Sequence, residues 1–235
     1  MDQVSRFASL LGLLRARLLH AGAAVVLASG LSGCQAIILL GYLIGGPPST
    51  DPDFHIKTKQ TLAGKNKITL VYCYAPKELK WDNEAVDYEL AKHLAYQLNA
   101  KKIRVVDPDR VHAWLDKHDK WKKTAEIGAA FKADYIVHVD VKDYSLFEAN
   151  SSNLYRGRAD CIVNVVKMNE DKKDGEVIYT KPIKSNFPTR APVDSNAMAF
   201  SEFKKRYLSA LSDEIGRLFY SSETGDDIPY GMLHQ

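Results

Sequence analysis

Apolar and polar residues between positions 67 and 222 follow two periods, one typical of strands and the other of helices. A nearly continuous apolar run over 68–74 predicts a strand that is covered on both faces. Alternation over 154–168 predicts a long strand with one buried face. Apolar residues at helical spacing predict helices over 83–99 and 195–220. These two periods together predict a sheet with helices packed on it.

Shorter segments complete the order of elements. We expect strands at 103–106, 135–147 and 177–183, and two helices between positions 108 and 132. The resulting order is β-α-β-α-α-β-β-β-α, in which the last three strands follow one another. Such an order is typical of a mixed sheet with parallel crossovers first and hairpins afterwards. The predicted fold class is therefore α/β, of the mixed α+β kind, in a single domain over 67–222.

The first 33 residues have the pattern of a bacterial lipoprotein signal peptide. Arg6, Arg15 and Arg17 give a positive n-region, and residues 18–31 form an uncharged apolar stretch that ends in small residues. The run Leu31-Ser32-Gly33-Cys34 then matches a lipobox, in which the cysteine receives fatty acyl chains such as palmitate and becomes the first mature residue. Cys34 is therefore the predicted lipidation site, and its lipid would anchor the chain to a membrane.

An uncleaved membrane helix is the alternative interpretation of this region. Apolar residues resume over 36–44, so that 18–44 as a whole is long enough for a bilayer, which needs roughly 20 apolar residues. Glycines and Gln35 interrupt the run, however, and small residues cluster where a signal peptidase would cut. This clustering favours the cleaved lipoprotein.

Residues 34–66 are predicted to hold the lipidated cysteine, a short apolar segment and a linker. Prolines and glycines over 45–52 prevent a helix there and would hold the domain away from the membrane. Gln35, rather than an aspartate, follows Cys34, which favours the outer over the inner membrane in lipoprotein families. We therefore expect a lipid-anchored protein of the cell envelope that faces the periplasm, with a flexible tail over 223–235.

Charge and composition exclude one class of partner. Three of the 32 basic residues and one of the 29 acidic residues fall in the signal, which leaves 29 basic and 28 acidic residues in the mature chain. A nearly neutral chain lacks the basic footprint of a nucleic-acid-binding protein, so we expect no nucleic-acid partner. The hydrophobic fraction of 46% is ordinary for a globular domain that buries a core.

Two cysteines remain if Cys34 is lipidated. An even pair in an exported protein is compatible with a disulfide between Cys73 and Cys161. Both residues lie inside apolar strand patterns, which favours two buried free thiols on separate strands. Neither interpretation predicts a metal site, since ligands at short spacing are missing around both cysteines.

The segment from Ile127 to Val137 carries a family resemblance. Its sequence Ile-Gly-Ala-Ala-Phe-Lys-Ala-Asp-Tyr-Ile-Val is similar to the helix–"GADY"–strand signature of a class of bacterial envelope lipoproteins, with Lys132-Ala133 where Gly-Ala is common. This class includes the amino-terminal domain of the Tol-Pal translocation protein TolB, the curli-secretion lipoprotein and lipoprotein activators of penicillin-binding proteins. The chain most resembles an uncharacterised lipoprotein group of the same layout. Over about 67–220, the resemblance implies this α/β fold and an adaptor role, and it carries over no catalytic residue.

Candidate chemistry is sparse. The sequence has no HExxH, no Walker loop and no GxSxG, and we expect neither catalysis nor a cofactor. His112, Asp116 and His118 form the densest ligand-like cluster, and the first two share a helix face. Neighbouring lysines disfavour a cation, so a solvated charged helix face is the preferred interpretation and no metal is predicted.

Three functions follow from these observations. The leading hypothesis is a non-enzymatic envelope lipoprotein that acts by contact with a still unidentified envelope protein, as an assembly factor or adaptor. The first alternative is a lipid-tethered periplasmic hydrolase with an unrecognised site around His112 and Asp116. The second is a secretion-channel subunit, which would need membrane-spanning hairpins with an apolar face. Arg158 and Asp160 on the strand over 154–168 disfavour that alternative.

Replacement of Cys34 by serine tests the anchor. Because serine cannot accept the thioether-linked lipid, we expect Cys34→Ser to move the protein from the membrane fraction to a soluble or unprocessed form. Cell fractionation followed by carbonate extraction measures this change. A substituted protein that stays equally membrane-bound after carbonate would support the uncleaved helix instead.

Overall fold

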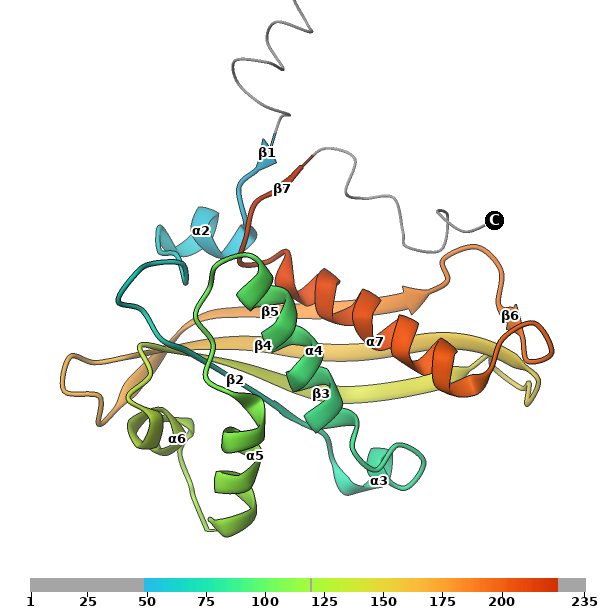
Figure 1. Cartoon of the computed structure of the whole chain (residues 1–235), viewed down its shortest axis with the longest axis horizontal. Coiled ribbons are helices and arrows are strands. Elements are labelled where there is room, and N and C mark those ends of the chain that lie inside the picture. Colours follow the sequence, from blue (N-terminus) through green and yellow to red (C-terminus); the bar gives the residue numbers. More distant parts are fainter. Residues whose placement is uncertain (1–48, 119, 224–235) are drawn as a thin grey trace, which may run out of the picture. The chain divides into compact units, whose positions relative to one another are not determined.

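A five-stranded mixed sheet organises residues 49–118 and 120–223, the part of the chain that the computed structural model describes (Figure 1). Strand β2 pairs in parallel with β3, and β3, β4 and β5 form an antiparallel meander, while short β6 pairs with β4. The bounds of these strands are Thr69–Tyr74 for β2, Tyr135–Phe147 for β3, Leu154–Met168 for β4, Gly175–Phe187 for β5 and Val193–Asp194 for β6.

Six helices lie around this sheet in the described residues, and two further short strands pair with each other. The helices are α2 (Asp53–Thr58), α3 (Lys77–Lys80), α4 (Val86–Ala100), α5 (Pro108–Lys117), α6 (Thr124–Phe131) and α7 (Phe200–Gly216). Strand β1 (Ser49–Thr50) pairs antiparallel with β7 (Ser222–Glu223). The predicted α/β class is confirmed, with the parallel crossover first and the hairpins afterwards.

One face of the sheet, called the inner face below, is buried under α4 and α7. The apolar stripes of the two helices pack on alternate residues of the strands and form the main core. Leu90 and Leu94 of α4 and Leu211 of α7 are fully buried in this core. Burial of side chains of this size stabilises the fold by about 1.5–3 kcal/mol for each of them.

Gly157 shows how closely α7 approaches the sheet. A β-carbon on Gly157 would come within 2.3 Å of the aromatic ring of Tyr207, which is fully buried on α7. No side chain fits in this space, so the inner face of β4 requires a glycine at this position.

Helices α5 and α6 cover only one corner of the opposite face. Their apolar side chains form a second, smaller core with the part of the sheet nearest to them. The strand residues in this core are Leu70, Tyr72, Ile136, Val166 and Met168. The rest of that face has no helix on it in the described residues (Figure 1).

The strand predicted at 103–106 is reduced to a single bridge between Val105 and Thr69. Backbone bonds from Thr69 N to Arg104 O and from Val106 N to Thr69 O form this one parallel rung. The ladder stops there because Asp107 caps the next helix and Pro108 begins it, so that the backbone turns away from the sheet.

The domain begins earlier than predicted, because part of the expected linker belongs to the core. Residues 53–58 form α2, in which Phe54 is fully buried and packs edge-on against Tyr179 of β5. The hydroxyl of Tyr179 donates to Asp53 Oδ2 at 2.6 Å and lowers the pKa of that carboxyl. Leu62, further along the expected linker, is also fully buried. The domain boundary at residue 67 was therefore wrong.

Two parts of the predicted organisation lie outside the described residues. They are the signal peptide with the first residues of the linker, up to residue 48, and the tail over 224–235. No helix of the described ranges is both long and apolar enough to cross a membrane.

Phe54→Ala tests the position of the domain boundary. Because Phe54 is enclosed by Tyr135, Tyr179 and Phe219, we expect its loss to lower the free energy of unfolding by about 3–5 kcal/mol. Ile56→Ala, on the exposed side of the same helix, should change it by less than about 0.5 kcal/mol. Urea denaturation of both variants measures the difference. Equal, small effects would show that α2 is not part of the cooperative core.

Candidate functional site

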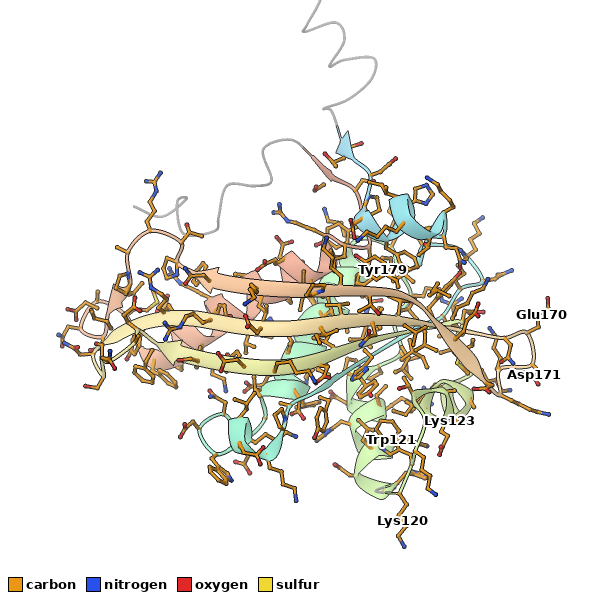
Figure 2. The ribbon with its side chains drawn as sticks, turned by 180° about the vertical axis from the view of Figure 1, so that it is seen from behind. Lys120, Trp121, Lys123, Glu170, Asp171 and Tyr179 are labelled. Carbon is orange, nitrogen blue, oxygen red and sulfur yellow. The ribbon has the colours of Figure 1, made fainter. Side chains whose placement is uncertain are left out.

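The uncovered part of the sheet forms a continuous surface of strand side chains, and we call it the outer face. Seen from behind, strands β3, β4 and β5 lie in front of α4 and α7 (Figure 2). The side chains on this side of the strands are half-buried or exposed, whereas those that alternate with them are buried in the main core. Its central residues are His138, Asp140, Ile162, Asn164, Thr180 and Pro182.

An apolar band crosses the middle of the outer face. The strand register places Tyr74, Asp140, Ile162 and Pro182 side by side on four neighbouring strands. Three of these four side chains are apolar or aromatic, and Tyr74 is 51% exposed. Strand alternation places these residues on the solvent side of the sheet, where polar residues are expected. Ile162 is half-buried and Pro182 is exposed, and apolar groups that stay accessible in this way are typical of contact surfaces.

A polar row lies next to the apolar band, and it consists of His138, Asn164 and Thr180 on β3, β4 and β5. His138 stacks on Tyr72 with ring centroids 4.5 Å apart, and Trp121 contacts the same tyrosine edge-on. Burial lowers the pKa of His138, so that its imidazole is neutral at pH 7. Its Nε2 atom is buried and has no hydrogen-bond partner among the described residues.

Ion pairs border the apolar band on its other side. Lys142 pairs with Asp140, and Lys184 Nζ lies 3.4 Å from Asp160 Oδ2. Thr180 Oγ1 donates to Asn164 Oδ1 at 2.8 Å in the polar row. The outer face thus has an apolar centre with polar and charged groups around it.

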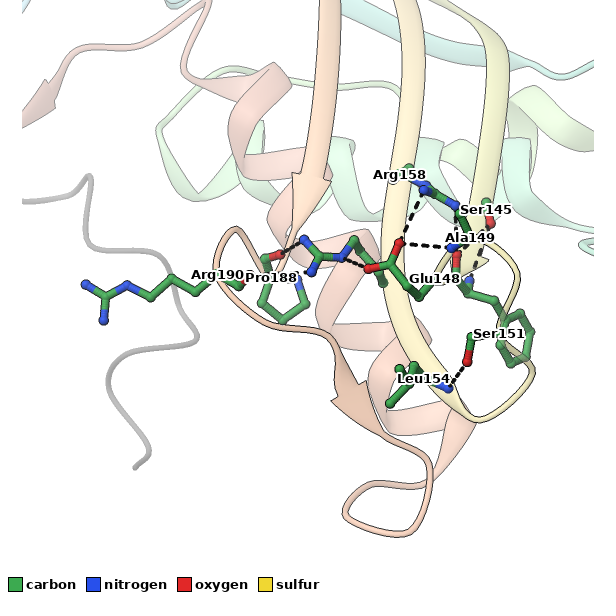
Figure 3. A network of polar contacts seen from close by, with 10 residues as sticks. Ser145, Glu148, Ala149, Ser151, Leu154, Arg158, Pro188 and Arg190 are labelled. Atoms are coloured by element: carbon green, nitrogen blue, oxygen red, sulfur yellow. Dashed lines mark hydrogen bonds and ion pairs between the residues drawn. The ribbon is translucent and has the colours of Figure 1, made fainter.

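Arg156 and Arg158 belong to a separate network at the end of the β3–β4 hairpin (Figure 3). Glu148 lies between them, with Oε2 2.5 Å from Arg156 Nε and Oε1 3.5 Å from Arg158 Nη1. The backbone N–H of Ala149 and then Arg156 lower the pKa of this carboxyl. Both arginines also donate to backbone carbonyls, those of Phe147 and Pro188.

This network changes the interpretation of the charges on β4. From the sequence, Arg156, Arg158 and Asp160 are interpreted as the solvent side of an edge strand, where charges oppose aggregation, with an anionic partner as the alternative. Strand β4 is central, not an edge, because it pairs with both β3 and β5. The two arginines are engaged by Glu148 and by carbonyl groups, so their charges hold the hairpin end together.

The weak alternative site around His112, Asp116 and His118 lies on the exposed side of α5. His112 Nε2 is 3.7 Å from Asp116 Oδ2, and its ring stacks on Tyr88. The ring of His118 stacks on Trp114, and its Nδ1 lies 2.8 Å from the Trp114 carbonyl oxygen. Each ring therefore has its own aromatic neighbour, and the structure does not bring the three side chains together around one point.

No group of three or more His, Cys, Asp or Glu side chains in the described ranges is arranged to hold a metal ion. Cys34, the predicted lipidation site, lies outside those ranges.

Cys73 and Cys161 are free and buried. They lie on β2 and β4 with β3 between them, and strands are about 4.7–4.9 Å apart, so their backbones are too distant for a disulfide. The disulfide alternative is corrected to two separate thiols. Burial raises the pKa of the Cys161 thiol to about 12 and that of Cys73 well above its ordinary value.

The fold of this chain is similar to folds of solved bacterial proteins, at low sequence identity. No family model and no curated protein matches this chain. Similar solved structures include a PelC dodecamer from Paraburkholderia phytofirmans, with 11% identity, a TM-score of 0.40, and 73% of this chain and 95% of that chain covered. Lipoprotein GNA1162 from Neisseria meningitidis has 11% identity, a TM-score of 0.40, and coverages of 63% and 97%. A minor lipoprotein from Acinetobacter baumannii has 12% identity, a TM-score of 0.27, and coverages of 64% and 90%. At these values the similarity assigns neither a family nor a function.

Alanine substitutions at His112, Asp116 and His118 test the alternative site. Since all three side chains are exposed on α5, we expect each variant to change the free energy of unfolding by less than about 0.5 kcal/mol and to keep its biological role. Thermal melts and complementation of a deletion strain measure both properties. Loss of complementation at an unchanged melting temperature would instead support the hydrolase or metal alternative.

Proposed function

We propose that this protein is a lipid-anchored component of the bacterial cell envelope that works by protein–protein contact through the outer face of its sheet. The observation that carries the proposal is the apolar band of Tyr74, Ile162 and Pro182, which lies on a sheet face without a covering helix in the described domain. A partner that covers this band would remove apolar surface from water, at about 25 cal/mol per Å².

The surroundings of the band suit such a contact. Specific interfaces have a desolvated apolar or aromatic core and a polar rim that stays accessible to water. On the outer face, Asp160 and Lys184 lie at the rim, and both are accessible. The rim carries charges of both signs, which would orient a complementary protein and reject many others.

The edge strand β5 favours contact through the face over extension of the sheet. Strand β5 pairs only with β4 among the described strands, so its second edge is open. Pro182 lies in the middle of this strand and supplies no N–H, while Lys181 and Lys184 flank it. Proline and lysine on an edge strand oppose the addition of a further strand. We therefore propose that the partner binds across the strands and not along the edge.

The anchor is part of the proposal and rests on the sequence. The lipobox at Cys34 supports attachment to a membrane of the cell envelope, with the domain in the periplasm, and Gln35 favours the outer membrane. Residues 34–48 would connect the lipid to the domain that starts at Ser49. A partner of this domain would then be an envelope protein within reach of that membrane.

A charged residue in the apolar band tests the contact surface. Ile162→Lys should abolish complementation of a deletion strain and at least halve the yield of in vivo photocrosslinks from a probe at Pro182, because a desolvated lysine opposes burial. Ile56→Lys is the matched control, since Ile56 is an exposed isoleucine on α2, and it should leave both readouts unchanged.

The melting temperatures of both variants decide how the result is interpreted. If Ile162→Lys melts like the unsubstituted protein and still complements fully, the outer face is not the contact surface. If both variants lose activity with unchanged stability, the effect does not depend on the apolar band, and the proposal fails as well.

A further inference from the structure

A cavity of about 410 Å³ lies beside the beginning of β2, and none of its lining residues belongs to the outer face. It is open to solvent and is lined by the segment that follows α4, the first residues of α5 and the last residues of α6. Three cationic side chains line this cavity, those of Arg104, Arg110 and Lys132. Val106 and Phe131 contribute apolar walls.

Two of the cations are held in place without being neutralised. Arg104 Nη1 donates to the backbone oxygen of Lys65 at 2.9 Å, and the guanidinium of Arg110 lies 5.7 Å from the centre of the Phe131 ring. Neither contact involves an opposite charge. Within residues 49–118 and 120–223, no ion pair joins Arg104, Arg110 or Lys132 to a carboxylate.

The nearby carboxylates are already used. Asp107 also lines the cavity, but its Oδ1 accepts the N–H of Asp109 at 3.0 Å and so caps α5. Asp134 does not line the cavity; its Oδ2 accepts the backbone N–H of the lining residue Ile68 at 2.7 Å, and its carboxylate is paired with Lys172. Three cations and one carboxylate therefore leave the cavity with an excess of positive charge.

We propose that this cavity binds a phosphate-bearing ligand of small-molecule size. A guanidinium offers a planar pair of N–H donors that fits two phosphate oxygens, and two such groups with a lysine can satisfy a dianion. A dianion would also relieve the mutual repulsion of the three cations, whereas a metal ion would add to it. The apolar walls and a volume in the range of small-ligand sites leave room for an organic group attached to the phosphate.

Two kinds of molecule in a cell envelope carry such a phosphate group: free phosphate esters and phospholipids, in their headgroups. Both would present the same oxygens to Arg104 and Arg110. They differ in the acyl chains, which only a lipid brings to the apolar walls. The test therefore compares probes that share the phosphate and differ in whether they carry acyl chains.

The experiment uses the full lipidated chain in an uncharged detergent and measures binding by isothermal titration. The probes are inorganic phosphate, sn-glycerol 3-phosphate, and dihexanoyl phosphatidylglycerol below its micelle concentration, with dihexanoyl phosphatidylcholine as the zwitterionic control. The variant Arg104→Gln/Arg110→Gln removes both guanidinium groups. The matched control Lys117→Gln/Lys205→Gln removes two charges from exposed side chains that do not line the cavity.

We expect at least one phosphate monoester or phosphatidylglycerol probe to bind, and the arginine variant to weaken that binding by about tenfold or more. The lysine control should weaken it less than about twofold, because neither side chain lines the cavity and exposed charges are screened by salt. Tighter binding of glycerol 3-phosphate than of phosphatidylglycerol would assign a free ester, and the reverse would assign a headgroup. Absence of binding by every probe, or equal weakening in the two variants, would overturn the proposal.

Discussion

The inner face of the sheet, buried under α4 and α7, is the constraint on which the remaining structure depends. Side chains of a strand alternate between its faces, so a slip of one residue would expose the whole apolar set of β4 to water. Gly157 restricts the position of α7 on the strand further, because only a glycine leaves space for the ring of Tyr207. The helix and the strand therefore fit together in one register.

That register also determines which side chains lie next to one another on the outer face. The side chains on the inner face pack in the core. Those on the other face of β3, β4 and β5 do not, so core packing does not determine which residues occur there. The row through Tyr74, Ile162 and Pro182 exists because three strands each contribute one residue at the same level. Selection on single residues of this row would leave the core unchanged, which suits a surface whose role is contact.

The sequence predicted the elements with strong periodicity and missed those without it. Strand β4 was expected over 154–168 and is observed over Leu154–Met168, because its alternation is long and uninterrupted. Helix α2 was missed because Phe54 and Leu62 are isolated apolar residues in a polar segment. Phe54 packs on Tyr179, more than a hundred positions away, and local pattern does not reveal such a contact.

The candidate sites show the same limit. His112 and His118 looked like a cluster because they are close in sequence, but Tyr88 and Trp114 each hold one of the rings. The outer apolar band could have been noticed only in part, since Ile162 interrupts the polar positions of β4. Its neighbours come from other strands, and their alignment with Ile162 follows from strand register, which a single sequence does not fix.

The pairing of β1 with β7 has a mechanical consequence. Tension applied to the backbone at Ser49 would first load the two-residue ladder that joins Thr50 to Ser222, and so short a ladder opens easily. The load would then pass to α2, where the Phe54 ring is enclosed and Asp53 is bound by Tyr179 of β5. Because Phe54 N also donates to Leu218 O, just after α7, at 3.0 Å, a pull from the N-terminal side would be shared between the edge strand β5 and the end of α7 once the short ladder had opened.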